Sequence, residues 1–445
     1  MGALLLSVSA LILSLFVLLA GNSMQFVILG LRADAEGFST LTIGVLAASY
    51  YVGYALGTFQ APGFVRRVGH IRAFAGVGSV ISAVVLAHSL WVDPIFWSAL
   101  RFITGMSFAV IATVTESWIN ARATRSVRGQ LLAVASISII LGYAVGPLVV
   151  SLGSVGGYPL FIVASILMSV GIVPVLVTRI GPPAVPAETA AESYTLMRLY
   201  RETPLGLVGT MVIGAAQGSF LGLGAVFANR AGLSDNGASY FVTGALVAGM
   251  LVQYPLGWLS DRFDRRRVIA FTTSLLGVGA VAAMLMMATV GPTLPVLVLS
   301  AAVAGIAAMP LYAVIVAYAN DRLPESTIVP AAAALILSFS IGSSLAGPVA
   351  SLAMDMFGPQ GLMGFLAVAL IALAGFTFVR MAVREDIPEE GEAAEESTGY
   401  EPTVFAASPV LRPMDWTPEE EQLEFDFTFG EDWASETDED ERLAA

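Results

Sequence analysis

Several residue types that carry common chemistry are absent from this chain. The 445 residues include no cysteine, which excludes disulfide frameworks and thiolate metal sites. All 21 basic residues are arginine, so no lysine is present to contact nucleotide phosphates or to form a Schiff base. The two histidines, His70 and His88, lack metal-ligand spacing. The sequence therefore predicts no metal site, no ATP-driven pump carried on this chain alone, and no enzyme.

Charge is also scarce over most of the length. Charged residues make up 12% and hydrophobic residues 56% of the chain, and the mean hydropathy is +0.80. Soluble domains carry roughly 25% charged residues. Residues 1–384 hold 19 arginines and 13 acidic residues, a net charge of +6, whereas residues 385–445 hold 21 acidic residues and two arginines, a net charge of −19. We expect an integral membrane body followed by an acidic, disordered tail.

Apolar runs of about 20 residues, the length needed to cross a bilayer, recur along the membrane body. The sequence predicts an all-α membrane protein with twelve transmembrane helices. The predicted spans are 4–30, 40–63, 73–92, 95–119, 130–152, 158–179, 205–229, 237–259, 268–290, 293–318, 328–351 and 359–381.

The distribution of arginine predicts the orientation, because cytoplasmic loops carry the excess of positive charge. Loops that follow odd-numbered spans hold only Arg32 and Arg230, and the other loop arginines follow even-numbered spans. We therefore expect a multi-pass protein of the bacterial inner membrane with both termini in the cytoplasm.

The chain contains an internal repeat. The basic segment Gly257–Arg267 has a weaker copy at Gly63–Arg72, and Gly347-Pro348 echoes Gly146-Pro147. Repeated six-span halves are typical of secondary transporters, and glycine and proline inside membrane helices permit close packing and bending. The predicted units are a first bundle at 1–179, a linker at 180–204 with a surface helix at 188–202, a second bundle at 205–384 and the tail at 385–445.

These motifs resemble the major facilitator superfamily over residues 1–384. The loop motif of that family is matched by Gly257, Asp261, Arg262, Arg265 and Arg266, with Asp264 where the family has a second glycine. Arg101-x-x-x-Gly105 and Gly142-x-x-x-Gly146-Pro147 resemble two further motifs of the superfamily, the second its antiporter motif without the trailing glycines. The segments similar to the YcaD-type bacterial branch are Glu116-Ser117-Trp118-Ile119-Asn120, Gln253-Tyr254-Pro255, Asn320-Asp321-Arg322-Leu323 and Glu36-Gly37-Phe38-Ser39. The resemblance implies a secondary transporter that works by alternating access, without a cofactor, with the proton gradient as an energy source.

The same resemblance implies a gating network of charges at the cytoplasmic ends of the helices. Such rim pairs are worth about 0–1 kcal/mol each, enough in combination to bias two conformations of similar energy. Ordinary positive-inside topology is the alternative reading. The candidates in the second half are Asp261, Arg262, Arg265, Arg266 and Asp321, and those in the first half are Glu116, Arg66, Arg67 and Arg72.

Polar and aromatic residues on the spans that line the cavity of this fold are candidates for substrate contacts. They are Asn22, Gln25, Tyr50, Tyr54, Arg101, Gln217, Phe220, Tyr254 and Tyr312. Amides and phenols over apolar walls suit a small, amphipathic, largely uncharged ligand, although the same residues also hydrogen-bond helices together. Arg101 is the single arginine away from the end residues of a span, and it either faces a cavity or extends to the membrane interface. The helix-packing candidates are Gly142, Gly146, Pro147, Gly347 and Pro348.

Three functions remain open at this stage. The first is a monomeric transporter of a small organic solute, with proton-coupled export. The second is an importer of an organic anion or sugar-like solute, with Arg101 as the anion contact. The third is a membrane sensor or scaffold whose acidic tail binds a cytosolic partner. No nucleic-acid partner is expected, and the candidate proton carriers are Glu116, Asp34, Glu36 and Asp235.

Overall fold

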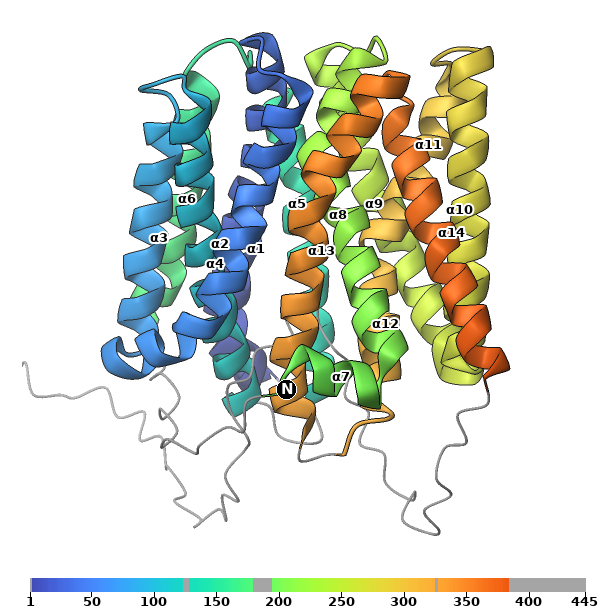
Figure 1. Ribbon diagram of the computed structural model, residues 1–445. Coiled ribbons are helices and arrows are strands. Elements are labelled where there is room, and N and C mark those ends of the chain that lie inside the picture. The colour runs from blue at the N-terminus through green and yellow to red at the C-terminus, as the bar shows by residue number, and fades with distance from the viewer. Residues whose placement is uncertain (1, 123–127, 179–193, 325–326, 384–445) are drawn as a thin grey trace, which may run out of the picture. The chain divides into compact units, whose positions relative to one another are not determined.

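The computed structural model describes residues 2–122, 128–178, 194–324 and 327–383 of the chain, and the regular elements there are helices (Figure 1). The predicted disorder of the tail at 385–445 lies outside these residues. The helices are α1 Gly2–Ala35, α2 Thr40–Val68, α3 His70–Ala87, α4 Pro94–Arg122, α5 Arg128–Val150, α6 Pro159–Val177, α7 Leu196–Glu202, α8 Pro204–Arg230, α9 Asp235–Arg262, α10 Arg265–Thr289, α11 Leu294–Ala308, α12 Pro310–Asn320, α13 Ile328–Phe357 and α14 Gly361–Ala382.

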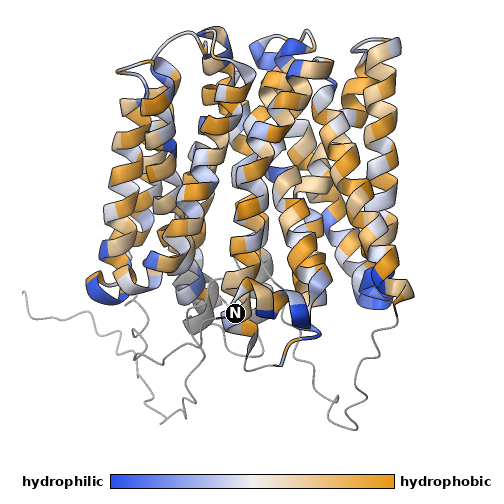
Figure 2. Ribbon diagram, viewed as in Figure 1, coloured by the Kyte–Doolittle hydropathy of each residue, from blue (hydrophilic) through white to orange (hydrophobic). Residues whose placement is uncertain are grey.

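The helices have the length and composition of membrane spans. In the described residues, eleven helical segments are long and apolar enough to cross a bilayer, with α11 and α12 counted as one, and Val134–Val150 of α5 is a shorter apolar helix. Figure 2 shows apolar residues along the helices and polar residues mainly near their ends. The expectation of an all-helical membrane protein with about twelve spans is confirmed.

Two local predictions need correction. The span predicted at 293–318 is divided into α11 and α12, with Met309 between them. Pro310 explains the break, because proline has no N–H to donate and its ring clashes with the carbonyl four residues earlier. Hydropathy alone does not detect this break. The linker helix predicted at 188–202 begins at Leu196 within the described residues.

Most contacts occur within two groups of helices. Helices α1 to α6 pack mainly on one another, as do α8 to α14. We call these groups the first half and the second half. Helices α2 and α13, α5 and α9, and α1 and α8 make the principal contacts between the halves. Relative movement of the halves would therefore change the contacts of residues on these helices.

Glycines permit the closest helix contacts. A Cβ atom added at Gly146 of α5 would lie 2.3 Å from the Ala20 carbonyl oxygen of α1, so the predicted packing motif joins two helices of the first half. One added at Gly347 of α13 would lie 2.2 Å from the Gly44 carbonyl oxygen of α2, in the other half. The two copies of the glycine–proline signature therefore make different kinds of contact.

Candidate functional site

A buried polar cluster lies around Arg101 in the first half. Arg101 of α4 is only 1% exposed. Its Nη1 donates to Oε1 of Gln25 in α1 at 3.1 Å. Its guanidinium carbon lies 4.0 Å from the centroid of the Phe26 ring and 4.5 Å from that of the Tyr50 ring. Arg101 therefore faces protein and does not extend to the membrane interface, and aromatic rings partly replace the water that its charge has lost.

Neighbouring helices supply further polar groups to this cluster. Asn22 Nδ2 of α1 donates to the Tyr50 hydroxyl of α2 at 3.2 Å. One residue further along α1, Ser23 Oγ donates to the carbonyl oxygen of Tyr143 in α5 at 2.6 Å. Tyr54 of α2 stacks on Tyr50, with ring centroids 6.3 Å apart. The structure thus brings together the predicted first-half residues Asn22, Gln25, Tyr50, Tyr54 and Arg101.

Part of the hydrogen-bonding capacity of this cluster is unused. Arg101 Nη2, Gln25 Nε2 and the Tyr51 hydroxyl are buried and have no hydrogen-bond partner among the described residues. An unsatisfied buried donor costs about 1–3 kcal/mol, and more when it is charged. These three groups are the kind that a ligand with acceptor atoms would satisfy. The polar inventory of the sequence predicted the cluster, but it did not show which atoms stay unpaired.

A cavity of about 10 Å³ lies beside Arg101, roughly the space that one water molecule needs. Residues from α1, α2 and α8 complete its wall. Gly222 of α8 is essential to this geometry, because a Cβ there would lie 2.4 Å from the Cβ of Ala47 in α2. An organic solute needs far more room than one water, so this cavity does not hold one as it stands. The lining residues are Phe26, Leu29, Gly30, Ile43, Leu46, Ala47, Arg101 and Gly222.

One second-half candidate, Tyr312, takes part in an aromatic contact between the halves. The rings of Tyr312 and Phe339 lie 5.2 Å apart, and Phe339 lies 6.4 Å from Tyr51 of the first half. Gln217 and Phe220 are buried in α8. These contacts place aromatic side chains of α12 and α13 next to the helix that carries Tyr50.

Tyr254 does not belong to this set, because its side chain is 81% exposed. The neighbouring residue Gln253 has a buried Oε1 atom. Successive residues on a helix point about 100° apart, so the two side chains have different surroundings. Tyr254 is therefore not part of the buried set, and its contact with a solute stays a prediction, whereas Gln253 is half-buried.

A charge network joins α9, α10 and α12 at the loop motif. Arg265 Nη2 lies 3.2 Å from Oδ1 of Asp261, and Arg265 Nε lies 2.9 Å from Oδ2 of Asp321. Arg266 pairs with Asp264 at 3.2 Å, whereas Arg262 stacks on Trp258 with its guanidinium carbon 4.2 Å from the ring centroid. The predicted partners Asp261, Arg265 and Asp321 are therefore brought together.

The pKa values of two acidic residues in this region, Asp321 and Asp264, are shifted in opposite directions. Burial raises the pKa of Asp321, and the charges of Arg265 and Arg322 only partly offset this. For Asp264, partial burial is outweighed by hydrogen bonds from the Arg266 side chain and backbone N–H and by the Arg266 charge, which together hold its pKa below the usual range. Asp264 also caps the N-terminus of α10 by accepting from the Arg266 backbone N–H at 2.8 Å. The motif departure at Asp264 therefore has a structural explanation.

The corresponding first-half charges are not assembled in the same way. Glu116 is buried in α4, whereas the arginines predicted to meet it are exposed. At this level the α3–α4 contact is instead a hydrogen bond of 2.7 Å between His70 Nε2 and Ser117 Oγ. The arginines concerned are Arg66, Arg67 and Arg72.

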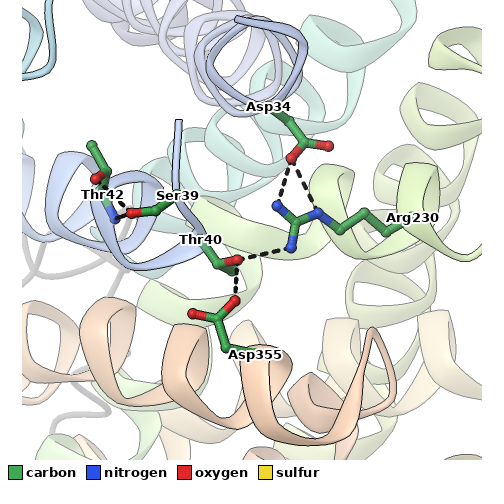
Figure 3. A network of polar contacts seen from close by, with 6 residues as sticks. All are labelled: Asp34, Ser39, Thr40, Thr42, Arg230 and Asp355. Atoms are coloured by element: carbon green, nitrogen blue, oxygen red, sulfur yellow. Dashed lines mark hydrogen bonds and ion pairs between the residues drawn. The ribbon is translucent and has the colours of Figure 1, made fainter. Parts of the chain in front are cut away.

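The remaining candidate proton carriers lie at the other end of the molecule from the loop motif, and each has a partner there. Glu36, in the turn after α1, pairs with Arg32 of that helix. Asp235 accepts from Asn229 Nδ2 at 3.0 Å. Asp34 pairs with Arg230 of the second half at 2.6 Å, in a set of contacts that sequence reasoning missed (Figure 3). Nothing in the sequence indicates that these positions, 196 residues apart, meet.

The comparisons with known proteins agree with this architecture. The model of the Major Facilitator Superfamily matches residues 11–252 and 205–418, and the chain belongs to that family. It is 29% identical over 349 residues to the uncharacterized MFS-type transporter YcaD of Escherichia coli O7:K1, covering 78% of this chain and 88% of the relative. The chain is therefore a multi-pass secondary transporter of the bacterial inner membrane.

Solved structures show the same fold at low sequence identity. The nucleoside transporter NupG superposes with a TM-score of 0.70 at 14% identity, covering 84% of this chain and 99% of that chain. The D-xylose-proton symporter superposes with a TM-score of 0.67 at 14% identity, covering 84% and 97%. At this identity the likeness concerns the fold alone.

Proposed function

We propose that the chain carries a small organic solute across the membrane by alternating access, and that the cluster around Arg101 is its binding site. The observation that carries this proposal is the buried guanidinium of Arg101, whose Nη2 has no partner among the described residues. A charged group inside a membrane helix is costly, and such groups mark substrate and ion pathways. A solute that accepts from Nη2 would offset part of that cost.

The position of the site between the halves supports the alternating-access part of the proposal. Its cavity is bounded by Ile43 and Ala47 of the first half and by Gly222 of the second. A cavity of about 10 Å³ admits a solute only if these walls separate. Relative movement of the halves would create that space and would open the site toward one side at a time.

The unpaired Nη2 favours a solute with an anionic group over a neutral one. Arginine binds carboxylates and phosphates through paired N–H donors, and such charge-assisted bonds are stronger than neutral ones. No ion pair to Arg101 occurs in the described part of the chain that would compete for it. A neutral amphipathic solute would instead use the Gln25 amide and the Tyr51 hydroxyl, and it remains the second candidate.

Export driven by protons, with both termini in the cytoplasm, completes the proposal and rests on the family resemblance. It would require one carboxylate to change charge during the cycle. Asp34, Glu36 and Asp235 each have a partner in this conformation, namely Arg230, Arg32 and Asn229.

Ligand-induced thermal stabilisation of the purified protein tests the site directly. A panel of small carboxylic acids and their neutral amides is compared. A ligand that binds the folded state raises the free energy of unfolding by about 2.7 kcal/mol at a concentration of 100 times its Kd, and Tm rises with it. We expect stabilisation by a subset of the acids, lost in Arg101→Met and retained in the control Arg32→Gln. Removing one partner of a buried charged hydrogen bond costs about 2–5 kcal/mol, or at least about thirtyfold in Kd.

The possible results separate the candidates. Stabilisation by amides alone would overturn the proposal of an anionic solute but would still support a transporter of a neutral solute. Hits that persist in Arg101→Met would place binding elsewhere. No stabilisation by any compound, from a protein that unfolds in one sharp transition, would contradict the binding site and favour the scaffold.

A further inference from the structure

Four polar residues from four helices form a connected network at the α1–α2 end of the molecule (Figure 3). Arg230 of α8 donates through Nη2 to Oδ1 of Asp34 at 2.6 Å and through Nε to the same oxygen at 3.1 Å. Its Nη1 donates to the Thr40 hydroxyl at 2.8 Å. That hydroxyl in turn donates to Oδ1 of Asp355 in α13. The network is continuous from Asp34 to Asp355.

This network connects the two halves of the molecule. Asp34 and Thr40 belong to α1 and α2, whereas Arg230 and Asp355 belong to α8 and α13. Arg230 is the one cation within the network and lies between two carboxylates from opposite halves. If it were removed, Asp34 and Asp355 would face each other without a counter-charge, and like charges repel.

The network is partly shielded from water. The Thr40 residue is 3% exposed, and the side chains of Arg230 and Asp34 are 30% and 19% exposed, whereas Asp355 is exposed. Charged hydrogen bonds in such a position are screened less by salt than those at an open surface. The contact therefore has more effect on the equilibrium between conformations than a fully exposed ion pair would have.

A direct backbone contact lies next to the network and extends it toward the Arg101 cluster. One helical turn after Thr40, a Cβ added at Gly44 would lie 2.4 Å from the Gly347 carbonyl oxygen and 2.1 Å from Ser351 Oγ. Ile43, in the same turn, lines the cavity beside Arg101. The network and the glycine contact therefore hold α2 against α8 and α13 beside the cavity.

We propose that Asp34, Thr40, Arg230 and Asp355 form a latch that holds the halves together at the α1–α2 end and sets the resting conformation. Access to Arg101 from this end requires Arg230 to leave Asp34 and Thr40. The latch rests on the alternating-access part of the proposed function but not on any particular solute. It can therefore be tested without a substrate.

The absence of native cysteine makes a labelling experiment possible. A cysteine is introduced by Ile43→Cys, a position 1% exposed beside the cavity, and its reaction with a membrane-impermeant maleimide is timed in intact cells and in inverted vesicles. We expect slow labelling with the latch intact. Arg230→Gln should accelerate labelling at least fivefold from the face on which the α1–α2 turn lies, and only from that face.

A matched control exists at the same end of the molecule. Arg32 pairs with Glu36 and donates to the Val155 carbonyl oxygen at 3.3 Å, so its contacts stay within the first half. Arg32→Gln removes the same charge from the same side and should change the labelling rate less than twofold. Thr40→Val keeps the side-chain shape, removes the link to Asp355, and should give an intermediate acceleration.

The outcomes decide the latch independently of the binding site. Equal labelling rates in Arg230→Gln and Arg32→Gln would overturn it, as would acceleration from the opposite face. Should Arg230→Gln fail to fold, the rate of Thr40→Val relative to Arg32→Gln carries the test. An accelerated rate with no ligand found for Arg101 would support the latch while the solute-binding proposal fails.

Discussion

The two halves of this transporter place their charged residues differently. In the first half, Arg101 is enclosed by helices and pairs with an amide and two aromatic rings. In the second half, Arg265 lies at a helix end and bridges Asp261 and Asp321, whose side chains are 64% and 49% exposed. The enclosed charge gains little from its surroundings and has unused donors, whereas the surface charges satisfy one another.

The two halves are copies of one repeat, yet this difference suits them to different roles. An enclosed and incompletely satisfied cation is suited to bind a ligand, because binding supplies what the protein does not. A satisfied network at a helix end is worth little for stability, so it is suited to shift a balance between conformations of similar energy. The asymmetry is therefore the main functional information in the structure, and the following predictions test it.

The largest expected effect on stability concerns the helix spacing that supports the first-half cluster. Gly146→Val places a side chain 2.3 Å from the Ala20 carbonyl oxygen and 2.6 Å from the Met24 backbone nitrogen, so α1 must move away from α5. We expect a loss of about 1–3 kcal/mol, the usual cost of overpacking, seen as a lower Tm. Gly244→Val on α9 is the control, because no atom lies within 4 Å of the added Cβ. A similar Tm for both variants would show that the α1–α5 spacing is adaptable.

The next prediction concerns the loop motif of the second half. Gly257 lies inside α9 with no atom within 4 Å of an added Cβ, so Gly257→Ala should raise the stability by about 0.5–1 kcal/mol through helix propensity. Gly249→Ala on the same helix should instead lower it, because the new Cβ would lie 2.5 Å from the Gly305 carbonyl oxygen. Thermal unfolding of both variants shows whether Tm rises for Gly257→Ala and falls for Gly249→Ala. A lower Tm for Gly257→Ala would mean that the motif glycine is held by a conformation other than the one described here.

The sequence was sufficient for the fold because helical membrane spans follow from hydropathy and length. It also placed Arg101 inside a span, but its partner Gln25 lies 76 residues away and no local pattern identifies it. Likewise, Gln253 and Tyr254 are adjacent polar residues whose directions depend on how α9 is rotated against its neighbours. Such rotations are set by tertiary packing, which a single sequence does not encode in readable form.

The latch was missed for a related reason. Asp34, Arg230 and Asp355 each lie near a helix end, where a charge is expected on solubility grounds alone. Their meeting depends on which ends of which helices converge: Arg230 is 196 residues from Asp34, and Asp355 is 315 residues from Thr40. The loop motif was easier to predict, because Asp261 and Arg265 are four residues apart and only Asp321 is distant.

The smallest expected effect concerns the pH response of the second-half network. The folded-state pKa of Asp264 is lowered, so its stabilising contribution is present above the unfolded-state value and is lost as the pH falls through the folded-state value. Asp264→Asn keeps the cap of α10, since asparagine caps helices as well as aspartate, and removes only the charge. The wild type should exceed this variant by a few tenths of a kcal/mol at neutral pH, a small value because the side chain is 35% exposed.

Asp321 should show the opposite pH dependence and provides the control. Because burial raises its folded-state pKa, ionisation disfavours the fold, and this penalty grows as the pH rises from the unfolded-state value through the folded-state value. The Tm difference between wild type and Asp264→Asn should therefore increase from acidic to neutral pH, and that between wild type and Asp321→Asn should decrease. Parallel trends in the two variants would mean that Arg265 and Arg266 act on both carboxyl groups as one cluster. The division of the network into an Arg266–Asp264 cap and an Arg265 bridge would then be wrong.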